Sequence, residues 1–299
     1  MGLALSNLVA MGVSSDMMAS ESLTNTSGLK VRFLGTGAAD WNGKNEIGEQ
    51  RRFSSVLLED HILIDFTPGD KEMLPDKHTP DVIFYTHSHP DHYNPQAAVE
   101  LGVKQIYVGY TWYDFAKSEL MAVAKKLNKE MPVLTPIYVG LPVKTGNLTF
   151  TPLPANHPTE KEFEQTLIYL VEKDDVRLLY ATDTAGIPAR AARLAGIDAH
   201  LQGKPITAFI MEATMGIEYE TDYRLFAHSS VADVNRIVKV LQKTKKYNPC
   251  KGQPVYLTHL ARTLHGSQKE LDEQLPEPLK AAYDGLEVIF NSPYKTSNN

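Results

Sequence analysis

The sequence predicts an α/β protein in which two packed mixed β-sheets are flanked by helices. Apolar, partly β-branched runs of strand length recur in both halves of the 299-residue chain. Segments with helical periodicity separate them, for example 231–241, where positions 231, 234, 237, 238 and 241 are apolar. Two strand-rich halves, each interrupted by helices, are typical of sheets packed face to face with helices outside. Because no linker or low-complexity tract divides the chain, we expect residues 29–299 to form one domain.

The first half contains an early strand, a hairpin and a strand buried on both faces. Residues 29–34 form the first strand and enter a tight turn at 35–37. The hairpin pairs 54–58 with 61–65, and 81–85 is a continuous apolar run of the buried type. Asn94 and Pro95 supply an N-cap and a first-turn proline, so a helix is expected to start there. A strand at 105–108 and a helix at 112–127 follow.

The second half contains a strand, a hairpin and two later strands around a helix. The expected strands are 148–153, 165–171, 176–180, 206–211 and 255–257, with a turn at 172–175 and the helix at 231–241. Several of these runs end next to His, Asp or Glu.

Composition limits the class of protein. There is no run of 18 apolar residues, so no membrane span is expected, and one cysteine, Cys250, fits a reducing cytoplasm. A formal net charge of −6 disfavours a broad electrostatic grip on long nucleic acid. Residues 1–28 are interpreted as a flexible extension, in which Gly2 with Ser6 fits the short N-myristoylation pattern. A homodimer stays open as an oligomeric state.

The stretch THSHPDHYN, residues 86–94, carries the clearest chemical signal. His87, His89, Asp91 and His92 lie within six residues, on a loop between a buried strand and a helix start. A single histidine is usually a hydrogen-bonded structural residue, but three histidines and an aspartate so close together indicate a metal site. Imidazole and carboxylate ligands without thiolate suit zinc first, with manganese or iron as alternatives.

This His-x-His-x-Asp-His pattern resembles that of the metallo-β-lactamase superfamily. His157 in PANHP, Asp183 in YATDTAG and His259 in YLTHL follow in the family's order, each at the end of an expected strand. The resemblance covers roughly residues 29–265 and implies an αββα sandwich with two divalent metal ions. It implies that one ion is held by His87, His89 and His157 and the other by Asp91, His92 and His259, with Asp183 bridging. It also matches Asp65 to an aspartate expected to orient the histidine loop.

Three further segments resemble the branch containing ribonuclease Z and the cyclic phosphodiesterases of phosphonate breakdown. They are FLGTGAAD at 33–40, MEAT at 211–214, where Met211 replaces the branch's histidine, and HSS at 228–230. The resemblance implies His228 as the acid acting on the phosphate and leaving group, with Glu212 orienting it and Asp91 also in the catalytic set. The alternatives are that His228 only precedes a helix capped by Ser229 or Ser230, and that Glu212 is a surface carboxylate.

The choice of substrate is less constrained. The 26 positions from His157 to Asp183 (183 − 157) hold only the expected hairpin, whereas ribonuclease Z proteins place a long arm in this interval. A small or cyclic phosphodiester is therefore expected. A transfer-RNA 3′-processing endoribonuclease, a lactonase or thioesterase, and a non-catalytic metal-stabilised binding module remain as alternatives. Tyr219, Tyr223 and Arg224 could contact substrate but fit a solvated loop better, and His265 has no assigned role.

Overall fold

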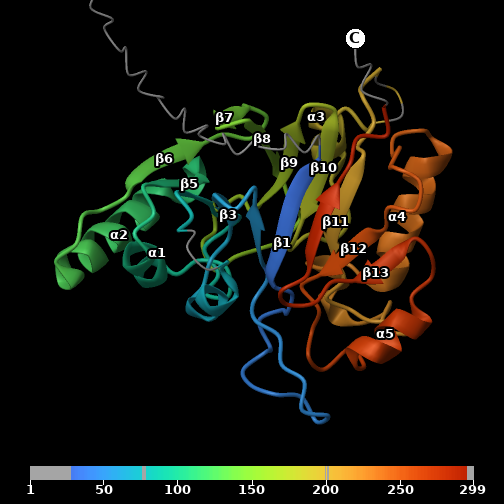
Figure 1. The fold of residues 1–299 in the computed structure, drawn as a ribbon, viewed down its shortest axis with the longest axis horizontal. Helices are drawn as coiled ribbons and strands as arrows, with labels where there is room; N and C mark the ends of the chain where they lie inside the picture. Colours follow the sequence, from blue (N-terminus) through green and yellow to red (C-terminus); the bar gives the residue numbers. More distant parts are fainter. Residues whose placement is uncertain (1–27, 76–78, 199, 201, 295–299) are drawn as a thin grey trace, which may run out of the picture.

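The structure is a computed structural model, and it describes residues 28–75, 79–198, 200 and 202–294. The expectations for Gly2, for the rest of the 1–27 extension and for His78 lie outside these residues. Figure 1 shows two sheets in the middle of the molecule, with helices on both outer sides. The expected sandwich is confirmed.

The first sheet has seven strands and joins the chain's N-terminal half to its last strand. Strands β1 to β3 and β14 pair antiparallel, whereas β3 to β6 run parallel. In spatial order the strands are β14 (Glu287–Phe290), β1 (Leu29–Gly35), β2 (Ser55–Leu58), β3 (Ile62–Ile64), β4 (Val82–Phe84), β5 (Gln105–Gly109) and β6 (Val133–Ile137).

The second sheet also has seven strands, antiparallel from β7 to β10 and parallel from β10 to β13. Its order is β13 (Leu279–Ala281), β12 (Val255–Thr258), β11 (Ala208–Glu212), β10 (Val176–Ala181), β9 (Leu167–Lys173), β8 (Leu148–Pro154) and β7 (Val143–Thr145). Because β8, β10, β11 and β12 run in the same direction, the residues that follow them gather at one edge of the sheet.

Side-chain alternation divides the core into three layers. Leu178 and Tyr180 of β10 point between the sheets, where they meet Phe84 of β4, while Leu179 and Ala181 point to the outer helices. This two-sided burial explains why the central strands are apolar throughout. The outer layers are helical: α1 (Pro95–Leu101) and α2 (Tyr113–Leu127) cover the first sheet, and α3 (Ala189–Leu194), α4 (Val231–Lys243) and α5 (Gln268–Gln274) cover the second.

The structure adds elements that the sequence analysis did not predict. These are the helices α3 and α5, the 3-10 turns η1 (Pro68–Met73), η2 (Tyr110–Trp112) and η3 (Tyr223–Phe226), and the strands β6, β7, β13 and β14. The helix expected at 112–127 begins at Tyr113, because η2 precedes it. The strand expected at 206–211 is shifted to 208–212, and Ile206 instead bridges to Tyr247.

Candidate metal centre

The histidine loop follows β4 and ends at α1, as the sequence predicted. The Asn94 side chain caps α1 by accepting a hydrogen bond from the Ala97 backbone N–H at 2.8 Å. Within the loop, the His92 and Tyr93 N–H groups donate to the His89 carbonyl at 3.0 and 2.8 Å, which closes a turn. The turn presents His87 and His92 to the interior, where both are fully buried.

The seven residues expected as metal ligands come together. His87, His89 and His157 offer nitrogen atoms within 4.8 Å of one another, as do the ligand atoms of Asp91, His92 and His259. Asp183 lies between the two groups: one carboxylate oxygen is 3.7 Å from His157 Nε2, and the other is 3.0 Å from His92 Nε2 and 3.3 Å from His259 Nε2. Two three-residue groups joined by one aspartate form the arrangement that the family resemblance implied.

Two buried nitrogen atoms test whether this cluster fits a metal. His92 Nε2 and His259 Nε2 have no hydrogen-bond partner among the described residues, although both are buried. Each lies within 3.5 Å of the carboxylates of Asp91 and Asp183. Buried polar atoms without partners are costly, and a cation between imidazole nitrogens and carboxylate oxygens would satisfy them. The donor set of nitrogen and oxygen fits a zinc-like divalent ion.

The protonation equilibria favour the ligand forms of the carboxylates. Burial opposes ionisation of Asp183, but His259 and His92 outweigh it and hold the pKa of Asp183 well below its usual value. Burial also opposes ionisation of Asp91, yet His92 and His259 keep its pKa well below the usual value. Burial, followed by the neighbouring His92, lowers the pKa of His87, so this imidazole stays neutral. Burial opposes protonation of His92, but Asp183 and Asp91 outweigh it and raise the pKa of His92 well above its usual value. Ionised carboxylates and neutral imidazoles are the forms that bind metal, so an ion bound there would displace the proton of His92.

Asp65, which was expected to orient the histidine loop, forms hydrogen bonds to two residues of that loop. It is fully buried after β3 and accepts hydrogen bonds from the Thr86 N–H and hydroxyl, both at 2.8 Å. Its Oδ2 is also 2.7 Å from Nδ1 of His92. This bond leaves Nε2 of His92 as the free ligand atom, which is the usual arrangement of a carboxylate behind a metal-binding histidine.

Three residues at the ends of strands adopt left-handed backbone conformations. Asp65, Asp183 and His259 have φ of 59°, 49° and 53°. Such values are uncommon outside glycine, and they occur mainly in Asn, Asp and His. A strand that ends in this conformation turns sharply, so the side chain is aimed across the sheet edge. Conformations of this kind concentrate at functional sites.

Glu212 and His228 form a pair beside the metal ligands. Glu212 ends β11 and is fully buried, so the surface-carboxylate alternative is wrong. His228 Nδ1 lies 3.1 and 3.2 Å from the two Glu212 oxygens. Burial alone would lower the pKa of His228, but Glu212 outweighs it and raises the pKa to about 9. Met211 points the opposite way, into the hydrophobic layer under α4.

Thr214 and Ser229 connect this pair to its surroundings. The sequence analysis assigned Thr214 no role and considered Ser229 only as a possible helix cap, a position that Ser230 takes instead. The Thr214 hydroxyl lies 2.8 Å from His259 Nδ1 and also bonds the Glu212 carboxylate. Ser229 donates to the Thr184 carbonyl at 2.8 Å and accepts from Gly186 N–H at 3.0 Å. The threonine thus joins a metal ligand to the His228 pair, and the serine joins the loops that carry Asp183 and His228.

The weaker candidates lie away from the ligand atoms. Tyr223 is 76 % exposed and Arg224 pairs with Asp222 at 3.1 Å, as in a solvated loop. His265 Nε2–H donates to the Ala213 carbonyl at 2.7 Å, behind the turn that carries Glu212. His61 and His200 are exposed.

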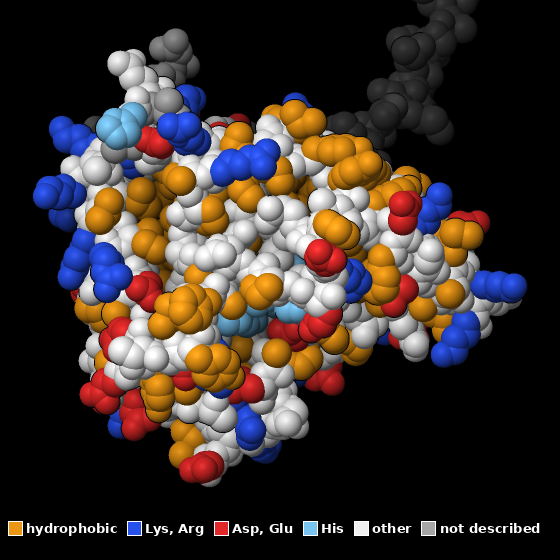
Figure 2. All heavy atoms as spheres, turned by 180° about the vertical axis from the view of Figure 1, so that it is seen from behind, with side chains coloured by type: hydrophobic (Ala, Val, Ile, Leu, Met, Phe, Trp, Pro, Cys, Tyr) orange, Lys and Arg blue, Asp and Glu red, His pale blue; other side chains and the backbone are white. Residues whose placement is uncertain are grey.

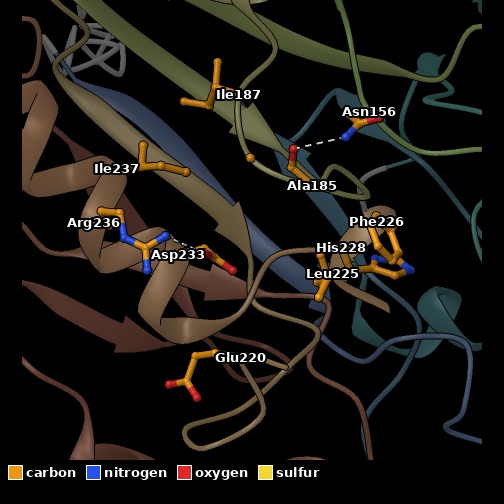
Figure 3. Close-up of a pocket in the computed structure, with 11 residues that line it drawn as sticks. Asn156, Ala185, Ile187, Glu220, Leu225, Phe226, His228, Asp233, Arg236 and Ile237 are labelled. Atoms are coloured by element: carbon orange, nitrogen blue, oxygen red, sulfur yellow. Dashed lines mark hydrogen bonds and ion pairs between the residues drawn. The ribbon is translucent and has the colours of Figure 1, made fainter. Parts of the chain in front are cut away.

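The site opens to solvent through a hollow. In Figure 2, histidine side chains are visible at the bottom of a depression near the middle of this face, between hydrophobic side chains. Next to it is a pocket of about 430 Å³, which Figure 3 shows between α4, the loop at 185–187 and the segment carrying Phe226 and His228. Arg236 lines this pocket but is paired with Asp233 at 3.0 Å, and Glu220 is also part of the lining. The pocket therefore carries no excess of positive charge.

The fold and the site define an αββα sandwich with a candidate two-metal centre at one edge. The chain belongs to the β-lactamase superfamily, because the family description "Beta-lactamase superfamily domain" matches residues 61–260. This fold family consists mostly of metal-dependent hydrolases. Among the described residues, none of the helices has the length and apolar character needed to cross a membrane.

Solved structures show the same fold at low sequence identity. A diphosphatase from the PhnP family has a TM-score of 0.61 and 20 % identity, covering 88 % of this chain and 98 % of its own. Zn²⁺-bound PqqB from Methylobacterium extorquens has a TM-score of 0.61 and 15 % identity, covering 87 % and 99 %. The short form of human tRNase Z has a TM-score of 0.60 and 16 % identity, covering 87 % and 98 %. No curated protein sequence matches the chain.

Proposed function

We propose that this protein is a metal-dependent phosphodiesterase acting on a small or cyclic phosphodiester. The observation that carries the proposal is the buried Glu212 carboxylate bonded to His228 directly beside the ligand cluster. Hydrolysis of a phosphodiester expels an alkoxide, which needs a proton or a positive charge near the phosphoryl oxygens. Lactam and lactone hydrolysis on this fold would use the same seven ligands, so the pair is the feature that favours phosphorus.

The residues of the site divide the work. One divalent ion would be held by His87, His89 and His157, and the other by Asp91, His92 and His259. Asp183 would contribute to both. Zinc suits these ligands best, with manganese or iron as alternatives. When bound, such ions supply an activated water and positive charge for an in-line displacement. Glu212 holds Nδ1 of His228, so that the opposite nitrogen, Nε2, is available to donate a proton to the leaving oxygen. Asp91 and Asp183 remain ionised, the form in which they would hold the ions and orient the attacking water.

Three observations support a small substrate. The segment between His157 and Asp183 is a short loop followed by the hairpin of β9 and β10, with no projecting arm. The pocket beside His228 measures about 430 Å³, which is the size range of small-molecule sites. The charged lining consists of one arginine, already paired, the protonated His228 and two acidic residues, so it carries no excess of positive charge for a polyanion. The names of two structural neighbours, a diphosphatase and a tRNase, concern phosphate-containing substrates.

The test is a panel of substrates with metal-loaded protein. We expect turnover of bis(p-nitrophenyl) phosphate and of a nucleoside 2′,3′-cyclic phosphate, with weaker turnover of a lactone, a thioester and a precursor transfer RNA. A diphosphate ester belongs in the same panel, since it shares the phosphoryl centre. Protein treated with a chelator is the control for each substrate. Preference for the lactone or thioester would overturn the phosphodiesterase assignment, and inactivity on the whole panel would favour a binding module.

A further inference from the structure

The loop after His157 holds the histidine loop at Ser88. We infer that Glu164 is a positioning residue for the ion held by His87, His89 and His157, an inference that rests on the metal centre of the proposed function. Neither the sequence patterns nor the family resemblance pointed to this glutamate. Its position on the loop at 158–166 places it seven residues after His157 (164 − 157).

The contact between the two loops is dense. The Ser88 N–H donates to one Glu164 oxygen at 2.7 Å, and the Ser88 hydroxyl donates to the other at 2.6 Å. The Thr159 hydroxyl adds a bond to Glu164 at 3.0 Å, and Lys161 Nζ donates to the Ser88 hydroxyl at 2.7 Å. Ser88 is 8 % exposed, so water competes little with these bonds.

These bonds fix the backbone at the point where two ligands leave it. Ser88 stands between His87 and His89, and Thr86 precedes His87. Thr86 is tied to Asp65 from the β3 side, and Ser88 is tied to Glu164 from the other loop. The two residues flanking His87 are therefore each held by a carboxylate. A histidine held on both sides loses little freedom when a metal binds.

The same loop is anchored to the segment between β5 and β6, which contains η2 and α2. Lys161 Nζ lies 4.0 Å from the ring centroid of Phe115 in α2, and the Gln165 N–H donates to the Thr111 hydroxyl at 2.9 Å. The segment with η2 and α2 thus contacts the loop that follows His157 and carries Glu164. Through its bonds to Ser88, Glu164 fixes the loop that carries His87 and His89 relative to the loop that follows His157.

The other metal group has different supports. His92 is held by Asp65 at 2.7 Å, and His259 by Thr214 at 2.8 Å. Glu164 contacts neither of them in any recorded bond. Loss of Glu164 should therefore weaken the first ion selectively, while the second keeps its affinity. Residues that orient metal ligands from behind typically change metal affinity by about 10- to 100-fold.

The experiment is a Co²⁺ titration followed by visible absorption, with metal content measured independently. In Glu164→Ala we expect one ion to bind as in the wild type and the other to bind about 10- to 100-fold more weakly. Glu164→Gln should recover much of the loss, since an amide still accepts from the Ser88 N–H. Glu162→Ala, an exposed glutamate on the same loop, is the matched control and should bind both ions normally.

Unfolding of the metal-free proteins distinguishes positioning from general stability. Equal weakening of both ions, or unchanged affinity for both, would overturn the inference. If Glu164→Ala fails to fold, Ser88→Ala decides, because it keeps the backbone bond and loses only the hydroxyl contacts; a normal first ion in that variant would also count against the inference. A wild-type protein that binds no metal would instead overturn the proposed function itself.

Discussion

If His228 protonates the leaving group, its replacement should slow turnover without removing the metal ions. His228→Ala should slow phosphodiester turnover by about 100- to 10,000-fold, the usual contribution of a positioned acid. Both ions should remain, because the three-histidine and Asp91 groups do not require His228. The measurement is kcat on an aryl phosphodiester together with metal content.

A second comparison uses the leaving group itself. An ester of p-nitrophenol leaves without help from an acid, so it should suffer less from His228→Ala than an alkyl ester does. Glu212→Gln should follow the same order with a smaller loss. Equal losses for both esters would assign His228 to charge stabilisation, and loss of a metal ion would make it a ligand.

His265 affects stability through pH. Burial lowers its pKa to about 4, while the unfolded chain has the usual value of 6.5. Between these values the unfolded state binds the proton and the folded state does not, so stability falls as pH drops from 6.5 to 4. The full effect is about 3 kcal/mol.

The prediction concerns the difference between two proteins. His265→Gln keeps a donor toward the Ala213 carbonyl but does not titrate. The gap in free energy of unfolding between wild type and variant should therefore narrow as pH falls from 7 to 4.5. Denaturant unfolding at several pH values measures it, and metal loss at low pH cancels because it affects both proteins. A constant gap would show that His265 is not buried as a neutral imidazole.

At the level of elements, the start of α4 sets where His228 lies. Ser230 accepts from the Asp233 N–H at 3.1 Å and completes a capping box with the Asp233 side chain. Removing a serine cap costs about 1 kcal/mol. Ser230→Ala should therefore lower the free energy of unfolding by roughly that amount. Ser230→Thr retains the cap and serves as the control in denaturant melts; a loss as large in Ser230→Thr would point to crowding rather than capping.

The strands that the sequence analysis missed share one property. The strands β14 and β6 are the edges of the first sheet, and β13 and β7 the edges of the second. Edge strands are covered on fewer sides, so their residues need not be apolar, and β7 has only three residues. Central strands such as β10 are buried on both faces and were predicted within one residue. The strands that could be predicted from the sequence are therefore the ones that are buried on both faces.

Across the whole molecule, the residues that cluster at the candidate site were predictable, whereas most of the residues that hold them in place were not. His87, His157, Asp183 and His259 stand in a recognisable order at the ends of apolar runs. Asp65 was also anticipated, because the family pattern includes it. Glu164 is a common residue type in a segment without a motif. Thr214 belongs to the MEAT segment, but only the three-dimensional contacts show what its side chain does. Which loops meet depends on how the two sheets pack, and that information is spread over the entire core.

Removal of metal should lower the stability of the whole protein. The centre gathers two ionised carboxylates and several buried imidazoles, and His92 Nε2 and His259 Nε2 have no hydrogen-bond partner within the described part of the chain. A ligand at 100 times its Kd stabilises the folded state by about 2.7 kcal/mol per site. For a domain of this size, 1 kcal/mol shifts Tm by roughly 2–4 °C. Adding zinc to chelated protein should thus raise Tm by at least about 5 °C.

If the ions stabilise the contact between the two sheets, the zinc-dependent rise in Tm must depend on Asp183. Asp183 is the residue that faces both metal groups, from the end of a central strand of the second sheet, while the histidine loop extends from the first sheet. Asp183→Asn should therefore lose most of the zinc-dependent rise in Tm, whereas a substitution of the exposed His200 should keep all of it. Thermal melts of the chelated and zinc-supplemented proteins measure both. An identical rise in Asp183→Asn would mean that the stabilising ion binds elsewhere.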